Sequence, residues 1–244
     1  MKLCVFGSQG RMGKLVREEA GDSVIACYDA RPPGRSPVEP LPGETDVVID
    51  FSLPSAWHDL DTLLSSGDAA LVSGTTGLGP SEEKMLRSWS RQRPVFYSSN
   101  MSRGIYVLGK LLKQAALMLK DQFSLEIVEY HHSGKVDSPS GTALTLAEIW
   151  RSAEGGGELV MGRSGPAGPR EDEEIGIHSV RGGDVTGDHE LNLLGQGERL
   201  CLSHSATGRR TFALGALRAA QFLRGMEPGL YGMEDMMNKR KEDR

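Results

Sequence analysis

Short apolar runs alternate with helical patterns over the first hundred residues. The expected strands are Leu3–Gly7, Ser23–Asp29, Asp46–Ser52, Ala69–Gly74 and Pro94–Ser98. The expected helices are Arg11–Ala20, Pro54–Ser66 and one whose N-cap is Ser81, with Glu82 and Glu83 in its first turn. Strands that alternate with helices predict βαβ units, and therefore a parallel sheet with helices on both faces. The connector Arg31–Gly43 is too short and proline-rich for a full crossover helix, so we expect one βα unit to be abbreviated.

The pattern changes after residue 102. A long amphipathic helix is expected over Ser102–Lys120, a strand over Leu125–His132 and a helix over Ser140–Arg151. Three strand patterns then follow with turns between them and no helix: Ile175–Val180, Glu190–Leu194 and Arg199–Ser205. Strands clustered in this way predict a second domain of α+β type with a mixed sheet. The stretch Gly155–Arg170 is rich in glycine, proline, serine and arginine, and is expected to be a long loop.

The end of the chain is expected to return to the first domain. Thr211–Leu223 has a helical pattern, and its position suggests packing on the first sheet. The expected domains are therefore residues 1–102 with 212–244, which form a discontinuous first domain, and residues 103–211. The charge run Asn238–Arg244 is expected to be a solvated tail.

Composition narrows the function classes. A net charge of −5 disfavours a nucleic-acid partner, because such proteins meet phosphates with a basic surface. No apolar run approaches the roughly 18 residues of a membrane span, and no signal-peptide pattern precedes the first strand, so we expect a cytoplasmic protein with no membrane partner. Three scattered cysteines, with Cys4 and Cys27 in apolar runs, predict buried reduced thiols.

A glycine-rich turn leaves the first strand and opens a helix, with the spacing Gly7-x-x-Gly10-x-x-Gly13. Glycine lets the backbone turn sharply and approach a pyrophosphate, and the helix N-terminus offers N–H groups and partial positive charge. By itself this signal is weak, because any tight βα turn can contain glycine. Asp29, at the end of the second strand, strengthens it, since a carboxylate there typically binds the adenosine ribose hydroxyls. The two features predict a Rossmann-like dinucleotide-binding domain.

The same carboxylate bears on the choice of cofactor. It favours NADH, because it would repel the 2′-phosphate of NADPH, while Arg11 and Arg31 could soften that repulsion and leave both cofactors in use. Two further strand ends, Gly74–Gly77 and Ser98–Met101, carry small and hydroxyl residues. Ligands in open α/β sheets lie beyond the carboxyl ends of the strands, so these turns are expected to join the same site.

The second candidate site is the stretch Glu129–Thr142, which reads EYHHSGKVDSPSGT. A histidine pair at a strand end is unremarkable alone, but Lys135 adds a positive charge in the following turn. Gly141 and Thr142 add N–H donors and a hydroxyl at a helix N-terminus, which suits a carboxylate. One loop thus combines a proton donor that works near neutral pH, cations and an anion site. That combination suits the reduction of an anionic C=N or C=C substrate.

These motifs resemble those of the 4-hydroxy-tetrahydrodipicolinate reductase family, also called dihydrodipicolinate reductases, of the diaminopimelate and lysine pathway. The resemblance covers almost the whole chain, and the His-His-x-x-Lys-x-Asp-x-Pro-Ser-Gly-Thr core is highly specific. It departs at Ser138, where the family usually has alanine, and in a shorter connector after Asp29. The motifs lie at Gly7–Gly13, Asp46–Ser52, Ser73–Gly77, Ser98–Gly104, Glu129–Ala143, Ser179–His189 and Gly197–Ala216.

The resemblance implies a role for each matching residue. His131 would be the catalytic acid/base, and Lys135 a second proton donor that also holds substrate charge. Substrate carboxylates would be bound by His132, Ser140, Gly141 and Thr142. The implied cofactor-binding residues are Gly7, Ser8, Gln9, Gly10, Arg11, Met12, Asp29, Gly74, Thr75, Thr76, Ser98, Ser99, Asn100 and Met101.

The resemblance also implies the reaction and the assembly. The substrate would lose a hydroxyl as water and take hydride from NADH or NADPH, giving tetrahydrodipicolinate. Members of the family are usually homotetramers joined through the sheets of the second domain. Two alternatives stay open: a related amino-acid dehydrogenase of the aspartate type, and a non-catalytic dinucleotide sensor.

The remaining histidines are weaker candidates. His58 is expected on the surface, and His178, His189 and His204 are expected to be structural. The sequence shows no metal-ligand spacing among histidine, cysteine and acidic residues, so no metal requirement is expected.

Overall fold

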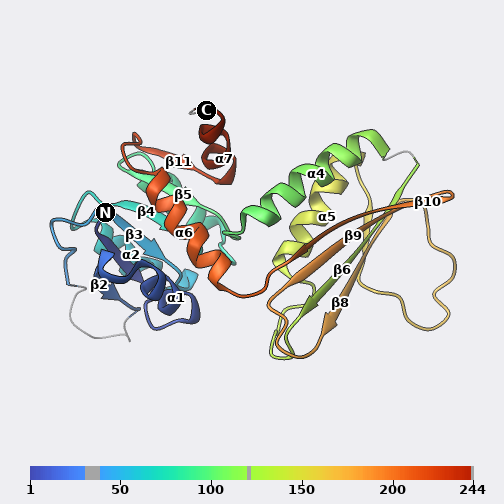
Figure 1. The fold of residues 1–244 in the computed structure, drawn as a ribbon, viewed down its shortest axis with the longest axis horizontal. Coiled ribbons are helices and arrows are strands. Elements are labelled where there is room, and N and C mark those ends of the chain that lie inside the picture. The colour runs from blue at the N-terminus through green and yellow to red at the C-terminus, as the bar shows by residue number, and fades with distance from the viewer. Residues whose placement is uncertain (31–38, 120–121, 243–244) are drawn as a thin grey trace. The chain divides into compact units, whose positions relative to one another are not determined.

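The structure is a computed structural model that describes residues 1–30, 39–119 and 122–242 (Figure 1). The chain divides into two compact units, Met1–Ser102 with Arg209–Arg244, and Arg103–Gly208. The expected boundary between residues 211 and 212 falls inside a helix, because that helix already begins at Arg210. Among the described residues, no helix is both long and apolar enough to cross a bilayer.

The first unit is built on a six-stranded sheet in the order β11-β5-β4-β3-β1-β2, in which every pair of neighbours is parallel. Its strands are β1 (Leu3–Phe6), β2 (Val24–Tyr28), β3 (Val47–Asp50), β4 (Ala70–Ser73), β5 (Pro94–Tyr97) and β11 (Gly229–Tyr231). Its α-helices are α1 (Arg11–Ala20), α2 (Trp57–Leu64), α3 (Pro80–Trp89), α6 (Arg210–Phe222) and α7 (Met233–Glu242).

Burial explains the short, continuous apolar strands of this unit. Every residue of β1, β3 and β4 is buried, as expected for parallel strands that are covered on both faces. On one face, Trp57 of α2 and Trp89 of α3 pack with their ring centroids 5.1 Å apart and their planes tilted by 48°, in a core with Phe6 and Val48. On the other face α1 packs on α6, and α6 packs on β3 and β4.

The strand order creates a switch point at β1. The chain moves from β1 to β2 on one side, and β3 then pairs with β1 on the other side. Connections on the two sides diverge at the carboxyl ends of β1 and β3, which is where open α/β sheets bind ligands. The described residues of the connection from β2 to β3 contain no α-helix, and the rest of that connection lies outside the described residues.

The second unit holds a five-stranded mixed sheet in the order β10-β9-β6-β8-β7. Its strands are β6 (Ser124–His131), β7 (Glu158–Val160), β8 (Glu174–Arg181), β9 (Asp188–Gly195) and β10 (Glu198–Ser205). Its helices are α4 (Arg103–Leu119) and α5 (Gly141–Glu154). In β6 buried and half-buried residues alternate, so one face of this sheet forms a core with α4 and α5. We call this the inner face. The predicted fold class, an α/β domain plus an α+β domain with a mixed sheet, is confirmed.

The start of α3 was predicted wrongly. Its N-cap is Gly79 and not Ser81, and Pro80 occupies the first helical position, where its missing N–H needs no partner. Glu82 reaches back to accept a 2.8 Å hydrogen bond from the Gly79 N–H. The helix therefore begins one half-turn earlier than the serine suggested.

Several other predictions need correction. The expected loop Gly155–Arg170 contains β7, because Glu158–Val160 pairs in parallel with β8. The expected tail Asn238–Arg244 continues α7 up to Glu242, and β11 was not predicted at all. Cys27 is exposed, since β2 is an edge strand, whereas Cys4 is buried. Parts of the connector Arg31–Gly43, Arg31 included, lie outside the described residues, as does Lys120.

Candidate functional site

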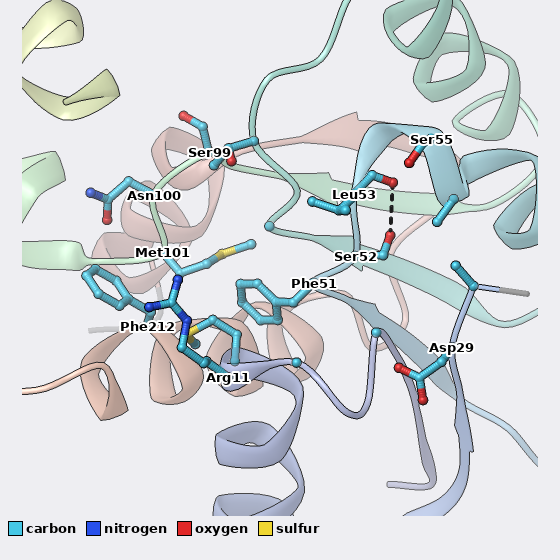
Figure 2. Close-up of a pocket in the computed structure, with 17 residues that line it drawn as sticks. Arg11, Asp29, Phe51, Ser52, Leu53, Ser55, Ser99, Asn100, Met101 and Phe212 are labelled. Atoms are coloured by element: carbon cyan, nitrogen blue, oxygen red, sulfur yellow. Dashed lines mark hydrogen bonds between the residues drawn. The ribbon is translucent and has the colours of Figure 1, made fainter. Parts of the chain in front are cut away.

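A cavity of about 560 Å³ lies at the carboxyl ends of five neighbouring strands of the first unit. Figure 2 shows the Asp29 carboxylate on one side of it, Ser99 and Asn100 on the other, and the Phe51 ring between them. Ten of the predicted cofactor residues line it: Gly7, Gly10, Arg11, Met12, Asp29, Gly74, Thr76, Ser99, Asn100 and Met101. The structure therefore brings together residues from four separate parts of the sequence.

The turn between β1 and α1 depends on glycine. Gly7 has a φ of +80°, a conformation that side chains disfavour. A Cβ at Gly13 would lie 2.2 Å from the Gly7 carbonyl oxygen, so the first turn of α1 packs directly on the loop. The loop and the N-terminus of α1, which begins at Arg11, both border the cavity. N–H groups and the helix dipole at such a place favour a phosphate anion.

Four predicted residues do not line the cavity, and each supports its wall instead. The Ser8 hydroxyl and the Gln9 N–H both donate to Asp29, at 2.6 and 3.0 Å. Thr75 is buried, and its hydroxyl donates to Asp50 at 2.8 Å. The Ser98 hydroxyl donates to the Asn100 carbonyl at 2.7 Å.

Asp50 is a structural centre that the sequence analysis did not single out. Its fully buried carboxylate ends β3 and accepts hydrogen bonds from the Ser73 hydroxyl at 2.7 Å and the Ser52 N–H at 2.9 Å, besides the one from Thr75. These bonds tie the carboxyl ends of β3 and β4 together. A buried carboxylate that is fully hydrogen-bonded fixes the loops around it.

Sequence reasoning also missed part of the lining. Seven further residues border the cavity, and most of them follow β3: Ala30, Phe51, Ser52, Leu53, Ser55, Ala56 and Phe212. Phe51 and Ser52 belong to a motif that carried the family resemblance, so their place after a buried strand was the available signal. Phe212 comes from α6, about 160 positions later in the chain, and only folding places it there.

The second unit contains a buried polar cluster around Glu129, on the inner face of β6. The Glu129 carboxylate accepts from the Ser140 N–H at 3.1 Å, the Ser179 hydroxyl at 2.8 Å and the Arg181 guanidinium at 2.8 Å. Burial alone raises the pKa of a carboxyl, yet these hydrogen bonds lower the pKa of Glu129 to about 2. The group therefore carries its negative charge throughout the neutral range.

Two histidines border this carboxylate. Nδ1 of His131 lies 3.6 Å from Glu129 Oε2, and Nε2 of His189 lies 3.8 Å from the same oxygen. The two rings meet edge to face, with centroids 5.4 Å apart. Burial lowers the pKa of His131 below its usual value, against the opposing charge of Glu129, and burial followed by the charge of His131 lowers the pKa of His189 to about 4.

The rest of the predicted stretch surrounds this cluster. Lys135 Nζ makes two 2.8 Å contacts with the Asp137 carboxylate, and the Asp137 carbonyl accepts from Arg181 at 2.8 Å. Ser140 caps α5, accepting from the Ala143 N–H at 3.1 Å. Gly141 and Thr142 form the first turn of α5, and His132 follows directly after β6.

Four members of this cluster were not predicted as site residues: Glu129, Ser179, Arg181 and His189. His189 was expected to be structural, but β9 pairs with β6 so that His189 stands opposite Glu129. Glu129 and Arg181 had a weak signal, since both lie in motifs that carried the resemblance. Each of the two also lies an even number of positions along its strand from a buried apolar residue, which places it on the same face. That pattern does not reveal which side chains it contacts.

The atoms of Glu129, His131 and His189 that could bind a metal lie within 4.8 Å of one another. No spacing in the sequence reveals this, because His189 comes from a distant strand. However, the carboxylate already pairs with the positive charge of Arg181 and with two further donors. The Arg181 guanidinium therefore already supplies the positive charge that a metal ion would bring to Glu129.

Comparison with known proteins assigns both units. The family model described as "Dihydrodipicolinate reductase, N-terminus" matches residues 1–101, and "Dihydrodipicolinate reductase, C-terminus" matches residues 104–237. The chain belongs to the dihydrodipicolinate reductase family. The family resemblance inferred from the motifs is thus confirmed.

Relatives of this dihydrodipicolinate reductase family member match almost its full length. The 4-hydroxy-tetrahydrodipicolinate reductase of Wolinella succinogenes is 44% identical over 254 residues, which cover 97% of this chain and 98% of that relative. The enzyme of the same name from Akkermansia muciniphila is 40% identical, with 97% and 98% covered. Among solved structures, a dipicolinate-bound dihydrodipicolinate reductase from Paenisporosarcina sp. TG-14 superposes with a TM-score of 0.72 at 21% identity, over 96% of this chain and 98% of that one. That structure supports the fold.

Proposed function

We propose that this protein reduces 4-hydroxy-tetrahydrodipicolinate to tetrahydrodipicolinate with NADH or NADPH, in the diaminopimelate and lysine pathway. The observation that carries the proposal is the match to full-length relatives named for that activity, at up to 44% identity. For each turnover, one hydride and one proton enter the substrate, and its hydroxyl leaves as water. The first unit would act as the dinucleotide-binding domain, and the second as the substrate-binding domain.

The residues around the cavity of the first unit fit a nicotinamide dinucleotide. The N–H groups of residues 7–10 already donate within the unit, so the N–H groups in the first turn of α1 would meet the pyrophosphate. Arg11 lines the cavity and adds a cation at the N-terminus of α1. The dinucleotide, when bound, supplies the hydride of the reaction.

Asp29 supports a preference for NADH. Its carboxylate lines the cavity and would accept hydrogen bonds from the adenosine ribose, whereas a 2′-phosphate would meet a like charge. Arg11 lines the same cavity and would weaken that repulsion. We therefore expect both cofactors to be used, with NADH favoured.

In the second unit, the residues present two chemical functions. His131 would deliver the proton at neutral pH, and Lys135 would hold a substrate carboxylate and serve as a second proton donor. The start of α5, at Ser140, Gly141 and Thr142, would bind a carboxylate with its N–H groups, with His132 beside it. A small cyclic dicarboxylate offers one anionic group to each place.

The second sheet also supports a homotetramer. Its outer face, opposite α4 and α5, carries the half-buried Val128 and Tyr130 and the exposed Val180. An apolar strip on a sheet face suits a second copy of the chain. The mass of the purified protein by light scattering tests this directly: a mass near 26.4 kDa, that of one chain, would contradict the tetramer.

A coupled assay tests the function. The synthase that makes the unstable substrate is combined with the protein, and oxidation of NADH and of NADPH is followed in parallel. We expect turnover with both, and a fall in kcat of about 100-fold or more for His131→Gln, with a modest change in cofactor affinity. Turnover of L-aspartate with NAD in place of this reaction would favour an amino-acid dehydrogenase. NADH binding with no turnover of either substrate would favour a sensor.

A further inference from the structure

The buried carboxylate of Glu129 has two different sides. Hydrogen bonds from Ser179 and Arg181 both reach Oε1, at 2.8 Å each. The Ser140 N–H lies 3.1 Å from Oε1 and 3.2 Å from Oε2. Oε2 is the oxygen that faces His131. The donors thus hold the carboxylate in one orientation and leave one oxygen directed at the candidate acid.

His131 needs an acceptor on its buried side. Among the residues that the structure describes, its Nδ1 is buried and has no hydrogen-bond partner closer than the 3.6 Å contact to Glu129 Oε2. A buried ring N–H without an acceptor is unfavourable, because its lost hydrogen bond to water is not replaced. A small closing movement would turn this contact into a hydrogen bond, and catalytic hydrogen bonds are often long before substrate binds.

The other side of the ring is kept clear. A Cβ built on Gly187 would lie 3.0 Å from His131 Nε2, so a backbone without a side chain borders this nitrogen. The His189 ring stands edge to face against His131 and restricts its rotation. Nε2 is therefore the nitrogen that Gly187 leaves without a side chain beside it, and Nδ1 is the one that faces Glu129.

We propose that Glu129 is a positioning residue, which holds His131 in the tautomer with hydrogen on Nδ1 and thereby leaves Nε2 to transfer the proton. The inference rests on the proposed function, in which His131 is the acid. Glu129 does not itself touch the substrate in this scheme. Its carboxylate orients the ring and stabilises the imidazolium when Nε2 is protonated.

The charges around His131 agree with this role. Glu129 and Asp137 raise the pKa of His131, whereas Lys135 and Arg181 lower it, after the larger lowering that burial causes. His189, the other ring in contact, is neutral at pH 7 because its pKa is about 4. Removing the charge of Glu129 should therefore lower the pKa of His131 further.

Glu129→Gln gives a sharp test. Ser179 and Arg181 demand an acceptor at the Oε1 position, so the amide oxygen should take that place and the NH₂ should face His131 Nδ1. An NH₂ donor requires the Nδ1 lone pair, so the tautomer should reverse. Nitrogen-15 NMR of histidine-labelled protein at pH 8 distinguishes the two tautomers, and loss of the signal in His131→Gln assigns it.

We expect kcat to fall about 100-fold in Glu129→Gln, with less than about a threefold change in KM. The pH at which activity is lost on the alkaline side should move lower, and Glu129→Asp, which restores the charge, should recover part of kcat. The matched control is Glu126→Gln. Glu126 is a half-buried carboxylate on the outer face of the same strand, bound to Arg163 and His178, and its change should leave the pH profile and the His131 tautomer unchanged.

The outcomes separate the two proposals. If His131 of the wild-type protein carries its hydrogen on Nε2, the positioning role of Glu129 is overturned, and this test does not depend on the folding of any variant. A Glu129→Gln protein with an unchanged tautomer and full kcat would overturn it too. Absence of dipicolinate-pathway turnover in wild-type protein, with the Nδ1–H tautomer present, would instead contradict the proposed function alone.

Discussion

The Ser8 hydroxyl donates a 2.6 Å hydrogen bond to the Asp29 carboxylate, and this bond links the turn after β1 to the end of β2. The adjacent Gln9 N–H donates to the same carboxylate at 3.0 Å. Asp29 therefore does more than line the cavity. It also holds the glycine turn, so its replacement by alanine would alter both the charge and the loop.

Asp29→Asn isolates the charge from the loop. The amide keeps the size of the side chain and an acceptor for the turn, but it removes the negative charge that opposes a 2′-phosphate. We expect the Kd of NADH to rise about tenfold, roughly the loss of one charged hydrogen bond, while the Kd of NADPH changes less. Fluorescence titration measures both. Ser8→Ala, which weakens the turn alone, should affect the two cofactors alike, and equal losses in Asp29→Asn would show that the carboxylate does not bind the ribose.

Gly74→Ala should disturb the centre of the cavity. A Cβ there would lie 2.3 Å from the Phe51 ring, so the ring must move. Overpacking of this kind typically costs about 1–3 kcal/mol. We expect a lower free energy of unfolding and weaker binding of both cofactors. Gly43→Ala is the control, because a Cβ at Gly43 meets no atom within 4 Å. Recovery of binding in the double variant with Phe51→Leu would support the clash as the cause.

Lys135 and Asp137 predict an effect on substrate affinity. In the proposed role of Lys135, a substrate carboxylate would compete with Asp137 for its ammonium, which contacts both Asp137 oxygens at 2.8 Å. Asp137→Asn should lower KM about two- to fivefold, since an exposed ion pair contributes about 0.2–1 kcal/mol. Lys135→Ala should raise KM and lower kcat. Steady-state kinetics would contradict the role of Lys135 if both variants kept wild-type KM.

His189 predicts a loss of stability in mild acid. Its pKa is about 4 in the folded protein and near 6.5 in the unfolded chain, so between these values the unfolded chain binds a proton that the folded protein does not. The contribution of His189 to the free energy of unfolding is complete above pH 6.5. It falls by about 3 kcal/mol as the pH drops to 4. Urea unfolding at several pH values measures how steeply the free energy of unfolding changes with pH. His189→Asn should flatten it, whereas the exposed His58→Asn should leave it unchanged.

Removal of metal ions by a chelator is expected to leave the activity unchanged. Glu129, His131 and His189 approach closely enough to hold a metal ion, but Arg181 already neutralises the carboxylate. We expect full turnover after prolonged dialysis against EDTA. Loss of activity that zinc restores would show that the three side chains bind a metal.

The chain's periodicity predicted most of the elements and both sheet types, because apolar spacing is a local property that reflects burial. The predictions from periodicity were wrong where another local feature, or pairing with a distant strand, decided the structure. Ser81 was a plausible cap, but the Gly79–Pro80 pair starts α3 earlier. β7 and β11 are three residues long and exist only through pairing with β8 and β5, so no local pattern predicts them.

The same division holds for the candidate sites. By themselves the residues determined a glycine turn followed by a carboxylate, and a loop with histidine, lysine and a helix start; the specific motifs added the family. The tertiary structure alone decided that Ser8 and Asp29 are bonded, that Phe212 borders the cavity, and that His189 stands beside His131. These contacts join residues that are far apart in sequence. Their partners are chosen by strand order and register, which arise from the packing of the whole unit.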